Sequence, residues 1–223
     1  MATTVAIPEE YLEDPLAYLP CSRILEYPKG QVIYDQNHPP SSLNLVIEGK
    51  VKVSRTSDDG RQTVVDIYRK DDFFGESVFL VRPMGEESAV ALESTKLMNW
   101  PLSSVVELMA RQPKLGIALV QLLAQRGLEF GERIGSFSVD NISRRLARNL
   151  IRFSDRMGEQ RGDGAVRIMP LTHELLSQVV GTSREIVTHY MNQFRRQGYL
   201  QYSRRGIFVY RDSLREWLRQ PAA

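Results

Sequence analysis

The pattern of apolar and polar residues between positions 171 and 196 predicts two short helices that meet at a glycine. In the second helix, apolar side chains recur at the i, i+3, i+4, i+7 spacing of one buried face: Val187, Tyr190, Met191 and Phe194. Before it, Thr172 can cap the first helix, and Gly181 supplies the backbone freedom that a tight turn needs. The segment is therefore predicted to be a helix-turn-helix, with an ordinary packed helical hairpin as the alternative.

The outward face of the second helix carries polar side chains, namely Arg184, Glu185, Thr188, His189 and Asn192. An α-helix has the right diameter to enter the major groove of DNA, where such side chains can reach base edges and phosphates. This face predicts that the chain binds double-stranded DNA.

The first half of the chain has a different pattern. From Arg23 to Pro101, short segments of Val, Ile, Leu and Tyr alternate with turn signals such as Asp59-Gly60, at the spacing of an all-β barrel or sandwich. We expect a β-roll over this region.

A long helix is predicted from about Lys114 to Phe137. Residues at alternating steps of three and four form the seam of a two-stranded coiled coil: Val120, Leu123, Gly127, Phe130, Ile134 and Phe137. This stripe has two interpretations, because it can pack on the chain's own β-roll or on a second copy of the helix. A second apolar edge at Leu115, Leu119 and Leu122 is available for the roll, so we expect a homodimer.

The rest of the chain completes a winged DNA-binding domain. An amphipathic helix is expected near residues 144–158, a β-hairpin wing around Arg204-Arg205-Gly206, and a final short helix capped by Asp212 or Ser213. The predicted class is α+β, with a β-roll over residues 1–112, a dimerisation helix over 113–138 and a winged helix-turn-helix over 139–223.

Charge is distributed unevenly along the chain. Residues 140–223 hold 15 Lys and Arg against 8 Asp and Glu, whereas residues 1–139 hold 14 against 19. A basic domain joined to an acidic one is expected where only the first meets a polyanion. Hydrophobic content is 42%, no window reaches the roughly 18 apolar residues of a membrane span, and no secretory pattern opens the chain, so we expect a cytoplasmic protein with no membrane partner.

Candidate chemistry is sparse. Cys21 is the only cysteine, and His38, His173 and His189 lack metal-ligand spacing, so no metal site and no cofactor are predicted. The sequence contains no phosphate-binding glycine loop and no nucleophile elbow, which indicates that the protein is not an enzyme. A protein-interaction module remains the alternative from another class.

The order of these elements resembles the CRP/FNR (catabolite activator / fumarate-nitrate regulator) superfamily of bacterial transcription regulators. The resemblance is carried by Phe74-Gly75-Glu76, an Arg-Pro-containing turn, Ser88-Ala89, the long helix, and the segment VVGTSREIVTHYMNQFRRQGYL. It implies a cyclic-nucleotide-binding-type β-roll, a homodimer, and sequence-specific transcription regulation at a palindromic, TGTGA-like site. RNA polymerase is a further candidate partner.

In that family the first exposed residues of the recognition helix read G·C pairs, and here Arg184 and Glu185 hold those positions. Arginine can donate two hydrogen bonds to guanine, and glutamate can accept one from cytosine N4. His189 stands where the catabolite activator has a third base-reading arginine, and Thr188 is grouped with these base-reading candidates. For Glu185 a capping box with Thr182 is the alternative. Expected phosphate contacts come from short polar and basic side chains: Thr182, Ser183, Arg204 and Arg205.

The effector pocket is predicted to be degenerate. Family members that bind cyclic AMP carry an Arg-Ser pair after the Gly-Glu, whereas this chain has Glu87-Ser88 after Gly75-Glu76. A carboxylate there would repel the cyclic phosphate by about 1 to 4 kcal/mol.

Two further positions concern the same pocket. Arg82 is the candidate to replace the missing arginine, and Phe130 falls where cyclic-AMP binders place a Thr-Ser pair. We expect a regulator that does not depend on cyclic AMP. The alternative is a ligand-gated regulator of the same fold that responds to a cyclic nucleotide or another small metabolite.

Overall fold

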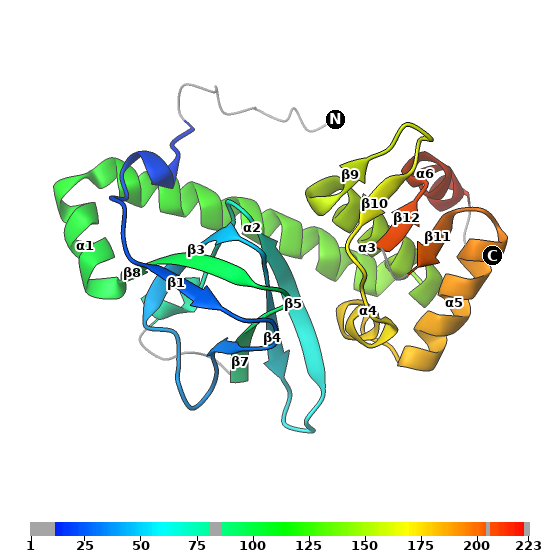
Figure 1. Ribbon diagram of the computed structural model, residues 1–223, viewed down its shortest axis with the longest axis horizontal. Helices are drawn as coiled ribbons and strands as arrows, with labels where there is room; N and C mark the ends of the chain where they lie inside the picture. The colour runs from blue at the N-terminus through cyan, green and yellow to red at the C-terminus, as the bar shows by residue number, and fades with distance from the viewer. Residues whose placement is uncertain (1–11, 81–85, 204–205, 221–223) are drawn as a thin grey trace. The chain divides into compact units, whose positions relative to one another are not determined.

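Short apolar segments separated by turns form strands in the first half of the chain, and helical periodicity forms helices in the second half (Figure 1). The computed structural model describes residues 12–80, 86–203 and 206–220. Within these ranges, no helix combines the length and the hydropathy needed to cross a membrane. The α+β class with a β-roll, a long helix and a C-terminal helix-turn-helix is confirmed.

By its internal contacts the chain divides into two units. The first comprises residues up to 53 and residues 67–133, and the second comprises residues 54–66 and those from 134 onward. The turn of the hairpin between the fourth and fifth strands is thus assigned to the second unit. The boundaries expected from the sequence, at 112 and 138, stay a prediction.

The β-roll consists of two four-stranded sheets among the described residues, with strand orders β1-β8-β3-β6 and β2-β7-β4-β5. Strand β8 is antiparallel to both β1 and β3, which it separates. The strands are β1 (Ile24–Tyr27), β2 (Val32–Tyr34), β3 (Ser42–Glu48), β4 (Lys50–Thr56), β5 (Gln62–Arg69), β6 (Phe73–Phe74), β7 (Glu86–Ala91) and β8 (Thr95–Pro101). In the described part of the chain, the short 3-10 helices η2 (Pro15–Ala17) and η3 (Glu76–Phe79) accompany them.

Two helices follow the roll, α1 (Leu102–Arg111) and α2 (Pro113–Val139). One apolar edge of α2 enters the core of the roll, where Leu115 and Leu119 pack with Phe73, Trp100 and other buried side chains. Leu122 packs against the same cluster. The expectation that this edge serves the roll is confirmed.

The stripe predicted for a second helix lies mostly on the surface of this single chain. Val120 and Ile134 are 65% and 67% exposed, and Leu123 and Phe137 are also exposed. At Gly127 an added Cβ would meet nothing within 4 Å. The stripe is therefore not used up by packing within the chain.

Among its described residues, the second unit contains a small sheet of order β11-β12-β10-β9 and the helices α3 to α6, which share one apolar core. Its elements are α3 (Ile142–Met157), β9 (Glu159–Gln160), β10 (Val166–Ile168), α4 (His173–Val180), α5 (Arg184–Arg196), β11 (Leu200–Ser203), β12 (Gly206–Val209) and α6 (Arg211–Arg219). Phe153, Leu176, Met191 and Phe194 are fully buried there.

One helix was not predicted, and one predicted helix cap is wrong. The helix α1 was not anticipated, and α6 begins after Tyr210, without a capping side chain, instead of at Asp212 or Ser213. Asp212 lies in the first turn of α6 and forms an ion pair with Arg215 at 3.4 Å. The carboxylate therefore faces along the helix surface and does not cap the helix.

Candidate nucleic-acid interface

The turn between α4 and α5 is built as a helix-turn-helix. Thr172 Oγ1 accepts a hydrogen bond from Leu175 N at 3.0 Å and caps α4, as the sequence predicted. Gly181 ends α4 with φ +72°, a left-handed conformation that residues with a Cβ adopt at a cost. Its amide and that of Thr182 both donate to the Ser177 carbonyl, which closes the turn.

The recognition helix α5 begins at Arg184, with Ser183 as its N-cap. Ser183 Oγ accepts from Ile186 N at 3.4 Å, so the capping box expected from Thr182 to Glu185 does not form. Glu185 lies in the first turn of α5, where hydrogen bonds from its own backbone N–H and from the Ser183 hydroxyl lower the pKa of its carboxyl group. Arg184, Glu185 and His189 are all exposed.

Thr188 is half-buried and bonded within the domain. Its hydroxyl donates to the Arg184 carbonyl at 2.8 Å, and its Oγ1 lies 2.8 Å from His173 Nδ1. Because Thr188 has one hydroxyl proton and directs it to the carbonyl, Nδ1 of His173 is the donor in the second bond. Burial first, and Arg184 second, lower the pKa of His173.

Tyr202 of strand β11 contacts the same region of α5. Its hydroxyl donates to Asn192 Oδ1 at 2.8 Å, and its ring meets the His173 ring edge-on at 5.8 Å. The Arg195 guanidinium lies over the Tyr202 ring, 5.2 Å from its centroid. One wing strand is thus tied to both helices of the motif.

Part of the basic charge of the C-terminal region is neutralised internally. The buried carboxylate of Asp140 pairs with Arg144 and Arg148, and Asp155 pairs with Arg211 and Arg215.

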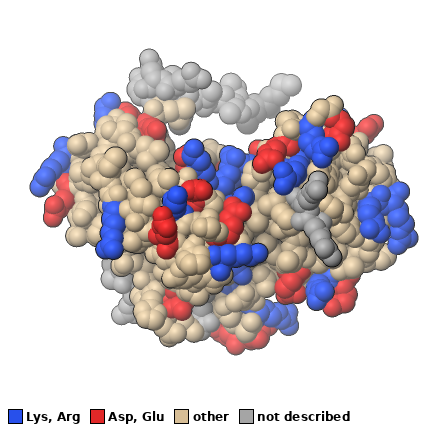
Figure 2. Space-filling view, viewed as in Figure 1, with Lys and Arg blue, Asp and Glu red and all other residues tan. Residues whose placement is uncertain are grey.

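The exposed basic groups around α5 are a separate set. Arg184 opens the helix, and Arg195 and Arg196 close it, all three exposed. Figure 2 shows Lys and Arg side chains gathered over the C-terminal end of α5. Positive charge is therefore available on the element predicted to meet DNA. Arg204 and Arg205, two expected phosphate contacts, lie outside the described residues.

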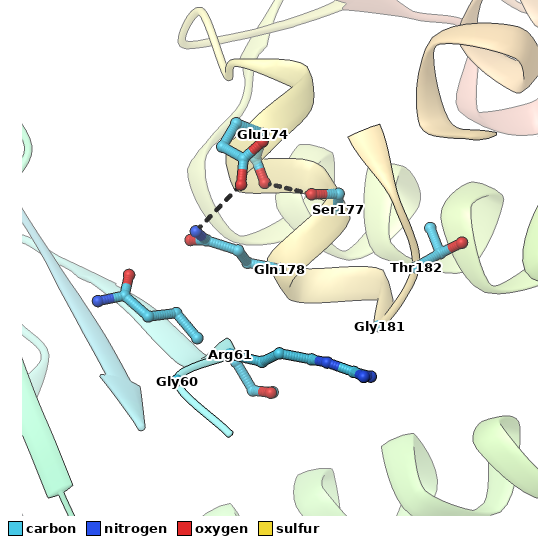
Figure 3. A pocket seen from close by; sticks show the side chains of 9 residues that line it. Gly60, Arg61, Glu174, Ser177, Gln178, Gly181 and Thr182 are labelled. Atoms are coloured by element: carbon cyan, nitrogen blue, oxygen red, sulfur yellow. Dashed lines mark hydrogen bonds between the residues drawn. The ribbon is translucent and has the colours of Figure 1, made fainter. Parts of the chain in front are cut away.

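A polar hollow of about 510 Å³ lies in the second unit, between residues 60–63 and α4 (Figure 3). Glu174 and Gln178 of α4 line it together with Arg61 and Thr182. Small-molecule pockets are mostly apolar with a few placed polar groups. The polar lining of this hollow does not mark it as an effector pocket.

In the β-roll, several residues of the predicted effector pocket come together. Gly75 has φ +86°, and a Cβ there would approach Asn44 Nδ2 to 2.9 Å, so glycine is needed at this position. Glu87 Oε1 accepts hydrogen bonds from the Tyr34 hydroxyl at 2.8 Å and from Ser77 Oγ at 3.1 Å. Burial, with Glu87 beside it, raises the pKa of Tyr34.

Arg126 of α2 completes this cluster. Its guanidinium pairs with Glu76 at 2.9 Å, donates to the Phe73 carbonyl and lies over the Tyr68 ring. The sequence analysis missed Arg126, although it follows Leu119 and Leu122 by seven and four residues, on the edge that faces the roll.

Three other residues were predicted to belong to the pocket, and the structure describes two of them. Phe130 is half-buried with the Arg133 guanidinium over its ring, 5.6 Å from the centroid. Ser88 is half-buried in β7, and Arg82 lies outside the described residues.

Both halves of the chain match known protein families. Residues 24–112 match the model of the cyclic nucleotide-binding domain, and residues 144–217 match that of the Crp-like helix-turn-helix domain. The chain belongs to the CRP/FNR superfamily of transcription regulators. The members of this family that the chain matches are regulators, so the prediction that it is not an enzyme is confirmed.

Individual relatives are similar to this CRP/FNR regulator over most of its length. A CRP-like cAMP-activated global transcriptional regulator of Mycobacterium tuberculosis is 27% identical over 83% of each chain. A global nitrogen regulator of Synechococcus elongatus is 23% identical over 84% of this chain and 86% of its own length. The structure of FixK2 from Bradyrhizobium japonicum has a TM-score of 0.76 at 20% identity, covering 91% and 99% of the two chains, which shows a common fold.

The shifted pKa of His173 predicts a pH dependence of stability. The pKa of His173 is lower in the folded protein than its ordinary value of about 6.5 in the unfolded protein, so protonation of His173 costs folding free energy. The free energy of unfolding is therefore greatest above about pH 6.5 and falls as the pH drops below that value. His173→Gln should therefore reduce the loss of unfolding free energy between about pH 7.5 and 5.5, measured by urea denaturation. The exposed His189→Gln is the control, and an equal effect of both substitutions would contradict the assignment.

Proposed function

We propose that this CRP/FNR regulator binds a palindromic, TGTGA-like DNA site as a homodimer, with Arg184 and Glu185 reading base edges and without dependence on cyclic AMP. The observation that carries the proposal is the first turn of α5. There Arg184 and Glu185 are exposed beside each other, while Val187, Met191 and Phe194 are fully buried on the opposite face.

The chemistry of the two side chains supports base reading. The ionised carboxylate of Glu185 can accept from cytosine N4, and the Arg184 guanidinium can donate twice to guanine. To reach a base, the Glu185 carboxylate must give up its hydrogen bonds to its own backbone N–H and to Ser183. The contact with the base must replace these two bonds. His189 follows on the same exposed face and reaches the outer part of the half-site. Thr182 and Ser183 are proposed as phosphate contacts.

The exposed stripe of α2 supports the homodimer. A surface that includes Val120, Leu123, Ile134 and Phe137 on a single helix is apolar and repeats at the spacing of a coiled coil. Gly127 in its middle allows the two helices to approach closely. We propose that a second copy of α2 covers this stripe and that the dimer acts on DNA in the cytoplasm.

The pocket cluster supports independence from cyclic AMP. Glu87 places a carboxylate, already bonded to Tyr34 and Ser77, where the family resemblance expects a phosphate-binding arginine. Arg126, a nearby cation, is committed to Glu76 and the Phe73 carbonyl. The cyclic-AMP activation named for the Mycobacterium tuberculosis relative belongs to that protein and marks the ligand-gated alternative.

Selection of duplexes from a random pool tests the proposed function as a whole. The selected duplexes should share an inverted repeat with half-sites about one helical turn, or about 34 Å, apart. Recovery of sequences without a common motif would refute sequence-specific recognition. Retention that does not weaken as salt rises would instead favour a protein-interaction module, because phosphate contacts release counterions.

Arg184→Ala should relax discrimination at one G·C pair of each half-site by about 1 to 3 kcal/mol. The measurement compares the affinities for the selected duplex and for its single-base variants. Arg219→Ala, an exposed arginine in α6, is the control. Unchanged discrimination in Arg184→Ala would show that Arg184 does not read a base.

Ile134→Glu should dissociate the dimer, because it places two carboxylates in the apolar seam. Analytical ultracentrifugation measures the change in mass. Gln125→Glu adds the same charge at an exposed position outside the stripe and should leave the dimer intact. A monomeric wild-type protein, or equal behaviour of the two variants, would contradict the proposed interface.

Cyclic AMP should give no binding heat in calorimetry and should change the affinity for the selected duplex by less than about twofold. The reason is that the negative carboxylate of Glu87 repels the negative phosphate of cyclic AMP. Saturable heat accompanied by tighter DNA binding would favour the ligand-gated alternative.

A further inference from the structure

The exposed face of α5 is divided into two edges by its contacts inside the domain. Arg184, Glu185 and His189 are exposed, whereas Thr188 and Asn192 are half-buried. The hydroxyl of Thr188 and the carbonyl oxygen of Asn192 each take part in a hydrogen bond within the domain. Thr188 and Asn192 form the second edge, and their polar groups are therefore already hydrogen-bonded inside the domain before any DNA binds.

Tyr202 holds one end of this second edge. It lies in β11, opposite Ile207 of β12, and reaches across to donate to Asn192 Oδ1. Its ring also supports the Arg195 guanidinium. A single aromatic side chain thereby fixes an amide and a cation that both project from α5.

His173 holds the other end. Its Nδ1–H donates to Thr188 Oγ1, whose proton goes to the Arg184 carbonyl, so a chain of two hydrogen bonds joins the start of α4 to the first residue of α5. Such a chain strengthens each of its bonds. The edge-on contact of His173 with Tyr202 connects the two ends.

We propose that Tyr202 and His173 are positioning residues for sequence-specific recognition: they hold Asn192 and Thr188, and through them they fix α5 so that Arg184, Glu185 and His189 meet the bases. This inference rests on the proposed function and assigns Thr188 a role inside the protein instead of at a base.

Base reading and phosphate binding differ in how much geometry they require. A bidentate contact with a base edge needs the helix held in one orientation, whereas contacts with phosphates tolerate displacement and supply most of the non-specific affinity. Loss of a positioning residue should therefore weaken binding to the selected duplex and leave binding to an unrelated duplex nearly unchanged.

Tyr202→Phe tests this directly, because it keeps the ring and removes only the hydroxyl. Fluorescence anisotropy with the full-length protein should show affinity for the selected duplex falling about two- to tenfold, the effect of one neutral hydrogen bond, with a change below about twofold for a scrambled duplex. Tyr210→Phe, which removes a hydroxyl bonded to Gln201 in the same domain, should change neither. Equal loss on both duplexes, or no loss on either, would overturn the role of Tyr202.

A double-mutant cycle tests His173. If Thr188 acts through His173, then His173→Phe and Thr188→Val should weaken specific binding non-additively, and the double variant should be about as weak as the weaker single variant. Additive losses would mean that Thr188 meets DNA by itself. A loss of non-specific affinity in His173→Phe would mean that His173 binds phosphate. Either result would overturn the positioning role.

Arg184→Ala in the same assay separates this inference from the function on which it rests. If Arg184→Ala lowers selectivity but Tyr202→Phe does not, only the positioning role fails. If Arg184→Ala keeps full selectivity, the proposed base reading by Arg184 is itself refuted, whatever the result for Tyr202→Phe.

Discussion

The packing of α4 against α5 is the constraint on which the rest of the molecule's chemistry depends. Leu176, Val187, Met191 and Phe194 are completely buried, and this fixes which side chains of α5 point outward. The left-handed Gly181 sets the angle at which α5 leaves α4. A polar surface becomes a recognition surface only when its backbone is held in this way, because base edges are read at hydrogen-bond distance.

In the β-roll, the charged side chains around the predicted effector pocket bond to groups of the protein itself. The carboxylate of Glu87 has protein donors, Tyr34 and Ser77, and the guanidinium of Arg126 has protein acceptors. Each of these charged side chains therefore has partners of its own within the protein. Because Arg126 belongs to α2, the same ion pair also attaches the long helix to the roll.

Periodicity along the sequence predicted the elements with long or regular patterns. The buried face of α5, the roll-facing edge of α2 and the strands of the roll all followed from it, because burial imposes the spacing. Helix α1 was missed because it starts directly after Pro101 of β8 and lasts only 10 residues. The expected cap of α6 was wrong because Asp212 pairs with Arg215 instead.

The candidate site was predictable only in part. Local spacing identified the residues of α5, but the bond from Tyr202 to Asn192 and the pair of Arg126 with Glu76 join separate elements. Such contacts depend on how the elements pack, which has no local sequence signal. For Glu185 the sequence offered base contact or a capping box, and the structure replaced Thr182 with Ser183 as the cap.

A hydroxyl-radical footprint on the selected duplex tests the central claim most directly, because it records where the backbone is covered. Two α5 helices related by two-fold symmetry should protect two equal regions on one face of the duplex, about 34 Å apart between centres. A single protected region, or two regions of unrelated spacing, would contradict recognition by a symmetric pair of helices.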